Sequence, residues 1–422
     1  MVNLSVRRRW LLFALVLTAG VLNYVDRQII AVLKPMMAAE LGWSDDDYGT
    51  LAAWFQGAAA VALIFTGWIV DKLGVKWANP VGVIAWSLAA IAHGWARSFT
   101  SFILVRVALG ATEAMGTPSA VKTVATILPP HQRSLGFGLS NAVSSTGAIL
   151  APLAIPAFAA VWGWRGAFIA GGLVGLVWGV VWLVAVRGVD FNDRKPDPEL
   201  VPEDADALPT EYGPILRDRR TWAIAGAKVL SDSTWWLLLF WLPDFFNRQY
   251  GLSGTALGVP LAIAYAGSAI GSVTGGAIQT RLLSIGWSVN RVRKTVMLVS
   301  ALLVLPIPLV LTMPSPTAAA LVIAVALAAH QGFSTTLFAL ITDVAPAEKV
   351  GRVTSFGAFS GNIGGMIIVK AAGMILAAGL GYMPLLLFAA VSYLLALGWI
   401  QLLLPRIRPV GGPAPAAGLA HH

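Results

Sequence analysis

The sequence predicts an all-α membrane protein in which twelve transmembrane helices form two six-helix bundles, with both termini cytoplasmic. Three observations support this fold class. Of the 422 residues, 57% are hydrophobic and only 12% are charged, and the mean hydropathy is +0.75. Apolar runs near the ~20 residues that cross a bilayer follow one another along almost the whole chain. Lys and Arg gather in alternate connecting segments. A soluble enzyme of one or two domains is therefore excluded.

The predicted spans are apolar runs bounded by charges or by Pro/Gly clusters. The first follows Arg7, Arg8 and Arg9 with no small-residue cleavage site after it, which favours a spanning helix over a cleaved signal peptide. The twelve runs lie near 10–33, 47–70, 77–96, 100–127, 134–159, 165–186, 220–247, 254–284, 292–313, 316–344, 351–377 and 382–404.

The distribution of basic residues sets the predicted orientation. Of the 29 Lys and Arg residues, 20 fall in segments that are cytoplasmic if both termini are, and four (Lys34, Arg97, Arg165, Arg248) fall on the other side. The net charge of +9 follows from this bias and does not indicate a nucleic-acid partner. The chain has no cysteine, which excludes disulfides and Cys-ligated metals.

One internal segment is unlike a membrane span. Residues 187–219 are polar, charged and rich in proline, and are predicted to be a central cytoplasmic linker. They separate an N-terminal bundle (1–186) from a C-terminal bundle (220–404), and 405–422 form a Pro/Gly/Ala-rich tail that is predicted to be disordered. Two similar bundles suggest alternating access to a site at mid-membrane depth.

Charged residues inside predicted spans are the strongest functional signal, because each costs about 2.5–3.5 kcal/mol to insert. In the first span, Asn23 and Arg27 share one helix face and Asp26 lies about 100° round. In the fourth, Arg106 and Glu113 share a face. An acid that exchanges an Arg partner takes up and releases protons, and a guanidinium suits a carboxylate ligand. The alternative is that these charges are structural ion pairs between the two spans, and for Arg106 a structural role is favoured.

Neutral side chains in the other spans are weaker candidates for a cavity lining. Trp236 could stack on a substrate ring or simply belong to the core, and a lone His in a helix is more often a hydrogen-bonded packing residue than a proton carrier. The candidates are Ser144, Asn141, Trp236, His330, Gln331 and Asn362. No Walker A, HExxH or nucleophile constellation is present, so we expect no enzyme activity, no cofactor and no metal.

These residues resemble a known family. Segment 67–76 (GWIVDKLGVK) is similar to the loop between helices 2 and 3 of major facilitator superfamily (MFS) transporters, in which the positions of Asp71 and Lys72 act in gating. Segments 23–28 (NYVDRQ), 240–243 (FWLP) and 329–332 (AHQG) resemble the anion:cation symporters, and within them the bacterial hexuronate and aldonate:proton symporters. The resemblance implies that Asp26 and Glu113 are protonation sites, that Arg27 holds the substrate carboxylate and that Arg106 exchanges partners with the acids.

The expected function is proton-coupled symport of a small organic anion, a hexuronate or related sugar acid, into a bacterium through the inner membrane. The expected partners are that anion, protons and the lipid bilayer, and the chain is expected to be a monomer. Ala59 stands where several sugar-acid relatives carry Tyr, and Ser144 where some aldonate transporters carry Gln. Another monocarboxylate, such as an aromatic acid, therefore remains an alternative. Proton-antiport efflux and a non-transporting acid sensor are further alternatives.

Overall fold

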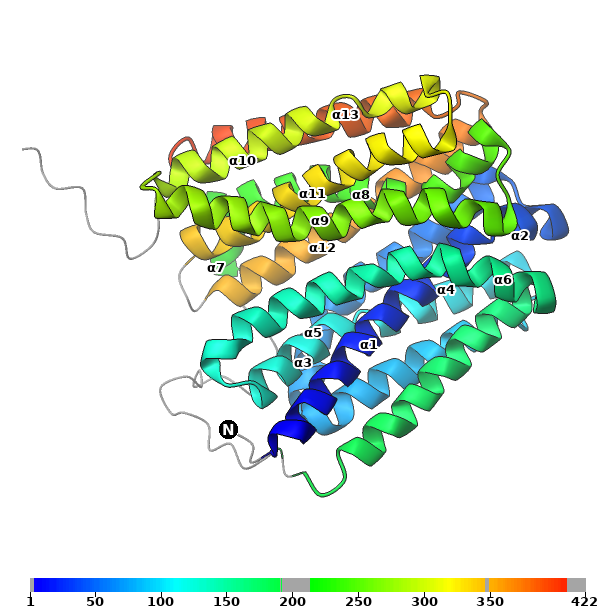
Figure 1. The fold of residues 1–422 in the computed structure, drawn as a ribbon, viewed down its shortest axis with the longest axis horizontal. Coiled ribbons are helices and arrows are strands. Elements are labelled where there is room, and N and C mark those ends of the chain that lie inside the picture. The colour runs from blue at the N-terminus through cyan, green and yellow to red at the C-terminus, as the bar shows by residue number, and fades with distance from the viewer. Residues whose placement is uncertain (1–3, 190, 192–212, 346–348, 408–422) are drawn as a thin grey trace, which may run out of the picture.

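The computed structural model describes residues 4–189, 191, 213–345 and 349–407, and this part of the chain is helical with no strand. Figure 1 shows two groups of helices side by side, α1–α6 and α8–α13. Most of the predicted 187–219 linker and of the 405–422 tail lies outside the described residues. The predicted domain boundaries therefore stay predictions.

The helices follow one another with short connections. Their bounds are α1 Val6–Val32, α2 Lys34–Leu41, α3 Asp45–His93, α4 Phe99–Glu113, α5 Gly116–Ile127, α6 Pro130–Ala185, α7 Gly213–Leu216, α8 Arg219–Tyr250, η1 Gly254–Leu257, α9 Gly258–Ser284, α10 Val289–Val304, η2 Ile307–Thr312, α11 Pro316–Val344, α12 Val350–Ala377 and α13 Met383–Leu403.

Two of these helices are interrupted by a glycine. Gly74 in α3 has φ 66° and ψ 170°, and Gly163 in α6 has φ 67° and ψ 176°. Glycine adopts such a positive φ readily because it has no Cβ. Both breaks fall between two predicted spans. The predicted 100–127 run is instead divided into α4 and α5, just before Pro118, whose ring cannot supply the backbone N–H that continues a helix.

Long apolar helices and exposed apolar side chains indicate that the protein lies in a membrane. Nine helical segments of the described chain are long and apolar enough to cross a bilayer. Leu, Val, Ile and Trp side chains remain exposed along them, as expected for a surface that contacts lipid. Helix α8 is also long, but Lys228 and Asp232 interrupt its apolar character. The chain is thus a multi-pass membrane protein, and the count of twelve spans stays a prediction.

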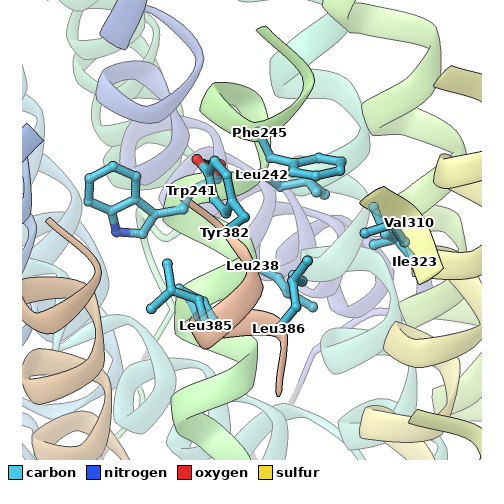
Figure 2. Close-up of a pocket in the computed structure, with 10 residues that line it drawn as sticks. Leu238, Trp241, Leu242, Phe245, Val310, Ile323, Tyr382, Leu385 and Leu386 are labelled. Atoms are coloured by element: carbon cyan, nitrogen blue, oxygen red, sulfur yellow. Dashed lines mark hydrogen bonds between the residues drawn. The ribbon is translucent and has the colours of Figure 1, made fainter. Parts of the chain in front are cut away.

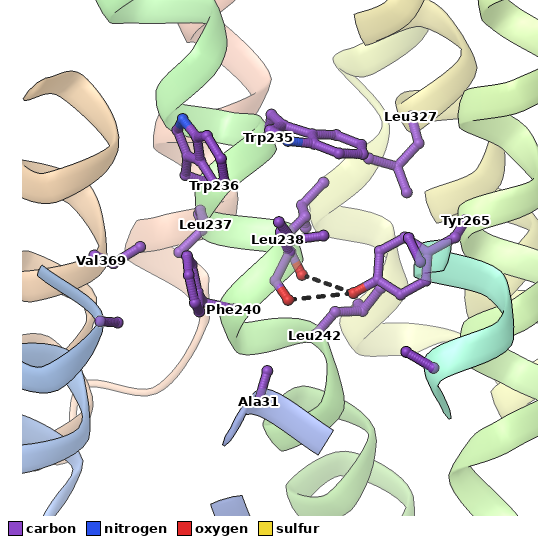
Figure 3. Close-up of a cluster of buried hydrophobic side chains, with 14 of the residues drawn as sticks. Ala31, Trp235, Trp236, Leu237, Leu238, Phe240, Leu242, Tyr265, Leu327 and Val369 are labelled. Carbon is purple, nitrogen blue, oxygen red and sulfur yellow. Dashed lines mark hydrogen bonds between the residues drawn. The ribbon is translucent and has the colours of Figure 1, made fainter. Parts of the chain in front are cut away.

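Helix α8 is at the centre of the C-terminal bundle. Its buried face carries Trp235, Trp236 and Phe240, and the Tyr265 hydroxyl of α9 donates to the Leu238 and Leu239 carbonyls at 3.4 and 3.3 Å (Figure 3). Across the bundle interface, α12 packs on α3. This packing fixes Trp236 beside the charged residues of α1, where the candidate site lies.

Candidate functional site

A cavity of about 640 Å³ lies between the two bundles, toward the end of the molecule that holds the chain's N-terminus. Its wall is mostly small and apolar, with Tyr24 and Trp86 as the large aromatic residues from the N-terminal bundle. The lining residues are Val16, Ala19, Gly20, Asn23, Tyr24, Asn79, Gly82, Val83, Trp86, Gly116, Thr117, Ser119, Ala120, Val121, Ser140, Ser144, Phe338, Val350 and Thr354.

The centre of the candidate site is an ion pair between α1 and α4. Arg27 Nη2 lies 2.9 Å and Arg27 Nε 3.1 Å from Glu113 Oε2, and Nη2 also donates to Asn23 Oδ1 at 3.1 Å. The Arg27 side chain is 13% exposed and that of Glu113 is fully buried. An ion pair between the first and fourth predicted spans was the structural alternative for these charges, and the structure shows that Arg27 and Glu113 form such a pair. Asn23 lines the cavity, so the ion pair lies directly behind its wall, and a substrate carboxylate that reached the guanidinium could replace that of Glu113.

Three aromatic rings surround the Arg27 guanidinium. Its Cζ lies 5.4 Å from the ring centres of Tyr24 and Phe55 and 5.2 Å from that of Trp236. Trp236 comes from α8, so the second bundle contributes to the surroundings of Arg27 as well. Cation–π contact and exclusion of water both strengthen the electrostatic attraction of this guanidinium for an anion.

Asp26 faces away from Arg27, as the 100° offset predicted. Its side chain is buried, and its Oδ1 would stand 2.9 Å from a Cβ added at Gly171 of α6. The Trp86 indole lies next to it, and Oδ2 has no hydrogen-bond partner of normal geometry among the described residues. Asp26 is therefore a buried acid beside a cavity-lining residue and not a member of the Arg27 pair.

Arg106 is fully buried, and within the described chain none of its three guanidinium nitrogens has a hydrogen-bond partner. Its Cζ lies 4.4 Å from the centre of the Phe55 ring, which also contacts Arg27. A buried guanidinium without a partner is costly. Arg106 thus stands one ring away from the Arg27–Glu113 pair with its donors unused.

The structure brings some of the predicted substrate-binding residues to the cavity and places others elsewhere. Asn23 and Ser144 line the cavity, and Ser144 Oγ donates to the Ser140 carbonyl at 2.6 Å. His330 is buried, accepts or donates at 2.7 Å to the Tyr393 hydroxyl and stacks on Trp235, away from the cavity wall.

Asn362 and Gln331 are not among the described residues that line the cavity. Asn362 donates to the Ala358 carbonyl of its own helix at 2.9 Å, and Gln331 is partly exposed. The side chain of Asn141 lies outside the described residues. Their substrate-binding roles stay predictions.

The loop at the first glycine break holds the predicted gating residues. Lys122 Nζ of α5 pairs with Asp71 Oδ1 at 2.8 Å and also donates to the Val70 and Asp71 carbonyls. Lys72 Nζ lies over the Trp68 ring at 4.5 Å. In this structure Asp71 therefore pairs within its own bundle, and a gating role for the two residues stays a prediction.

A charged network at the opposite end links the two bundles, and the sequence analysis missed it. Buried Lys34 Nζ lies 2.7 Å from Asp45 Oδ1 and 2.5 Å from Asp244 Oδ1 of α8. Arg248 bridges the same two carboxylates, with 2.7 Å from its Nε to Asp244 Oδ2. Tyr382 donates to Asp244 Oδ2 at 2.5 Å. The orientation argument counts only basic residues, so Lys34 and Arg248 looked like ordinary loop charges.

The same end is closed by close packing as well as by charge. Within the C-terminal bundle at this end, residues of α8, η2, α11 and α13 beside Tyr382 surround a void of only about 10 Å³, about the size of one water (Figure 2). A second cross-bundle pair joins Lys370 of α12 to Asp46 of α3 at 2.5 Å. Along the same contact, Gly49 approaches so closely that a Cβ there would stand 3.0 Å from the Gly373 Cα.

Two helical bundles with a cavity between them at one end and a close, charge-paired contact at the other are the architecture of a membrane transporter. The sequence of residues 16–369 matches the family model of the Major Facilitator Superfamily, and the chain belongs to this family. Its members are transporters and not enzymes.

Similar proteins include the hexuronate transporter of Escherichia coli K12, 27% identical with 92% of each chain covered. The D-galactonate transporter of E. coli O6:H1 is 25% identical, covering 96% of this chain and 97% of its own. The structure of a bacterial homologue of the human lysosomal transporter Spinster, in an inward-facing and occupied conformation, shares the fold. Its TM-score is 0.72 at 19% identity, with 94% and 97% of the two chains covered.

Proposed function

We propose that this protein imports a sugar acid, such as a hexuronate, together with protons through the inner membrane of a bacterium. The helical segments support twelve spans if α8 crosses the membrane and if α3 and α6 each cross it twice, with the reversals at Gly74 and Gly163. An even number of spans puts both termini on one side, and the excess of Lys and Arg makes that side the cytoplasm.

The observation that carries this proposal is the Arg27–Glu113 pair beside the cavity. A substrate carboxylate has the same shape and charge as the Glu113 carboxylate, so the two compete for one guanidinium. Protonation of Glu113 removes its charge and frees Arg27 for the substrate. One proton and one anion are then bound together, and no net charge is left uncompensated at the pair.

Arg106 and Asp26 complete the proposed cycle. Arg106 has free donors one aromatic ring from Arg27, so it is placed to take the Glu113 carboxylate when the substrate leaves with its proton. Asp26 is a second buried acid beside the cavity wall, and we assign it a second protonation step. Neither role requires a metal or a cofactor.

Proteoliposome uptake tests the proposal. Labelled D-glucuronate or D-galactonate should accumulate when an inward proton gradient is imposed and only equilibrate without one. Arg27→Ala should abolish uptake, whereas Arg165→Ala, which removes an exposed Arg paired with Glu40, should not. Accumulation that ignores the gradient would remove the coupling, and failure to transport any acid would remove the substrate class.

A less polar carboxylate is the second candidate, and a specific observation favours it. Twelve of the nineteen lining residues are Gly, Ala, Val or aromatic and would pack against an apolar ring, and the other seven carry hydroxyl or amide side chains. Benzoate that competes with labelled D-glucuronate at lower concentration than unlabelled D-glucuronate does would favour this candidate.

A further inference from the structure

Gln56 of α3 is a buried amide that no residue of the described structure satisfies. Its side chain is 0% exposed, and neither its Nε2 nor its Oε1 has a hydrogen-bond partner there. Leaving a buried amide unpaired is costly, and an apolar side chain of the same shape avoids the cost. Packing alone therefore does not explain a Gln at this position.

Two other buried amides, Asn79 and Gln279, are bonded. Asn79 donates to the Val75 carbonyl at 3.1 Å and to the Thr123 hydroxyl at 2.8 Å. Gln279 donates to the Gly275 carbonyl at 3.0 Å and accepts from Arg293 at 2.5 Å. The burial of these two amides is thus explained by their partners within the fold.

Gln56 lies next to the aromatic surroundings of Arg27. Its Nε2 stands 3.0 Å from the position of a Cβ added at Gly365 of α12, and Trp236 Cδ1 stands 2.3 Å from the same point. Trp236 in turn contacts the Arg27 guanidinium. Gly365 thus packs so closely on the amide and the indole that no Cβ fits between α12 and these two side chains. Gln56 follows Phe55, whose ring contacts both Arg27 and Arg106.

The contact that hides Gln56 is the one that joins the two bundles at the sealed end. One and two turns away on the same face of α3, Ala52 and Gly49 lie toward that end, and Gly49 meets α12. The Lys370–Asp46 pair spans the same contact. When the two bundles separate here, Gln56 becomes accessible on the far side of Arg27 from the present cavity.

We infer that Gln56 is a specificity-determining residue that binds a hydroxyl group of the sugar acid whose carboxylate Arg27 holds. An amide offers one acceptor and two donors side by side, which matches neighbouring hydroxyls that both donate and accept. A site that hydrogen-bonds a hydroxyl discriminates strongly against an analogue that lacks it, whereas an apolar pocket does not. This inference rests on the proposed function, because it takes the carboxylate at Arg27 as given.

The test compares two carboxylates on the full chain in lipid nanodiscs. Binding of D-glucuronate and of cyclohexanecarboxylate, which has no hydroxyls, is measured by titration calorimetry for wild type, Gln56→Met and Gln28→Met. Gln28 is the matched control, since it is also a buried amide but lies beside the Tyr265 hydroxyl of α9. Gln56→Met should weaken D-glucuronate binding at least about tenfold and should bind cyclohexanecarboxylate at least as tightly as wild type. Gln28→Met should change neither.

Thermal unfolding provides the second readout. Because the change removes an unpaired amide, Gln56→Met should unfold at the wild-type temperature or above. A clearly lower temperature would show that Gln56 serves the fold and would overturn the inference. Unchanged D-glucuronate binding, or equal losses for both carboxylates, would also overturn it. If wild type bound neither carboxylate, the proposed function itself would fail; retained glucuronate binding by Gln56→Met would refute this inference alone.

Discussion

Asp244→Asn should open the sealed end of the transporter. Asp244 is buried and contacts Lys34, Arg248 and Tyr382, so one substitution weakens the charged network on both sides of the bundle interface. Breaking a buried ion pair by removing one partner costs about 3–5 kcal/mol. We expect a cost at the low end of this range, because Lys34 keeps Asp45 as a second partner and the Arg248 side chain is 42% exposed. About 3 kcal/mol is about a 100-fold change in the equilibrium between closed and open forms.

The chain lacks cysteine, so single reporters need no prior removal of native thiols. Ala52→Cys places a thiol in the closed part of α3, and Ala120→Cys places one on the cavity wall. In the Asp244→Asn background, thiol labelling at position 52 should become faster by up to about 100-fold, and labelling at 120 should slow. Glu40→Gln is the matched control, because it breaks an exposed pair with Arg165 inside one bundle. Unchanged labelling at 52, or faster labelling at both positions, would refute this account of the closed end.

Three further outcomes follow from the site and the fold. Arg27→Lys should weaken carboxylate binding at least about tenfold in calorimetry, because a point charge cannot hold a carboxylate with two hydrogen bonds; wild-type affinity would exclude Arg27 as the ligand. Glu113→Gln should bind substrate with little dependence on pH and should exchange it without accumulating it in proteoliposomes, whereas normal accumulation would exclude Glu113 from proton coupling. Gly74→Ala should lower the free energy of unfolding by about 1–2 kcal/mol, measured by denaturant titration, because alanine strains at a φ of 66°; an unchanged value would contradict the role given to this break.

Local signals in the sequence predicted the helices well. The reversals at Gly74 and Gly163 fall between predicted spans, because loops with Gly and charges end apolar runs. The predicted span at 100–127 did not separate α4 from α5. The short helix α2 was missed, since its eight residues are too few to show a periodic pattern.

The candidate site was predictable as a set of residues but not as a set of contacts. The high free-energy cost of a charge inside a span identified four candidate site residues, which are Asp26, Arg27, Arg106 and Glu113. Helix geometry then separated Asp26 from Arg27. Which Arg pairs with Glu113 depends on how α1 and α4 cross, and no spacing along one helix contains that information. Gln56 was not predicted as a site residue for a similar reason. A neutral amide in an apolar run is a weak indication of a binding site, and only the structure shows that its polar atoms lack partners among the described residues.

Arg27 is partly exposed and Glu113 is fully buried, and this difference bears on whether protons can cross without substrate. Arg27 is 13% exposed and its partner Asn23 lines the cavity, whereas the Glu113 side chain is fully buried, so a neutral sugar brings nothing that can replace the carboxylate behind Arg27. A proton that reached Glu113 with no anion bound would leave Arg27 without a counter-charge in partly buried surroundings, at a cost of several kcal/mol. Under the proposed proton symport, the geometry that favours an acidic substrate would thus also oppose the passage of protons without substrate, and the proton gradient would not be dissipated by the empty carrier.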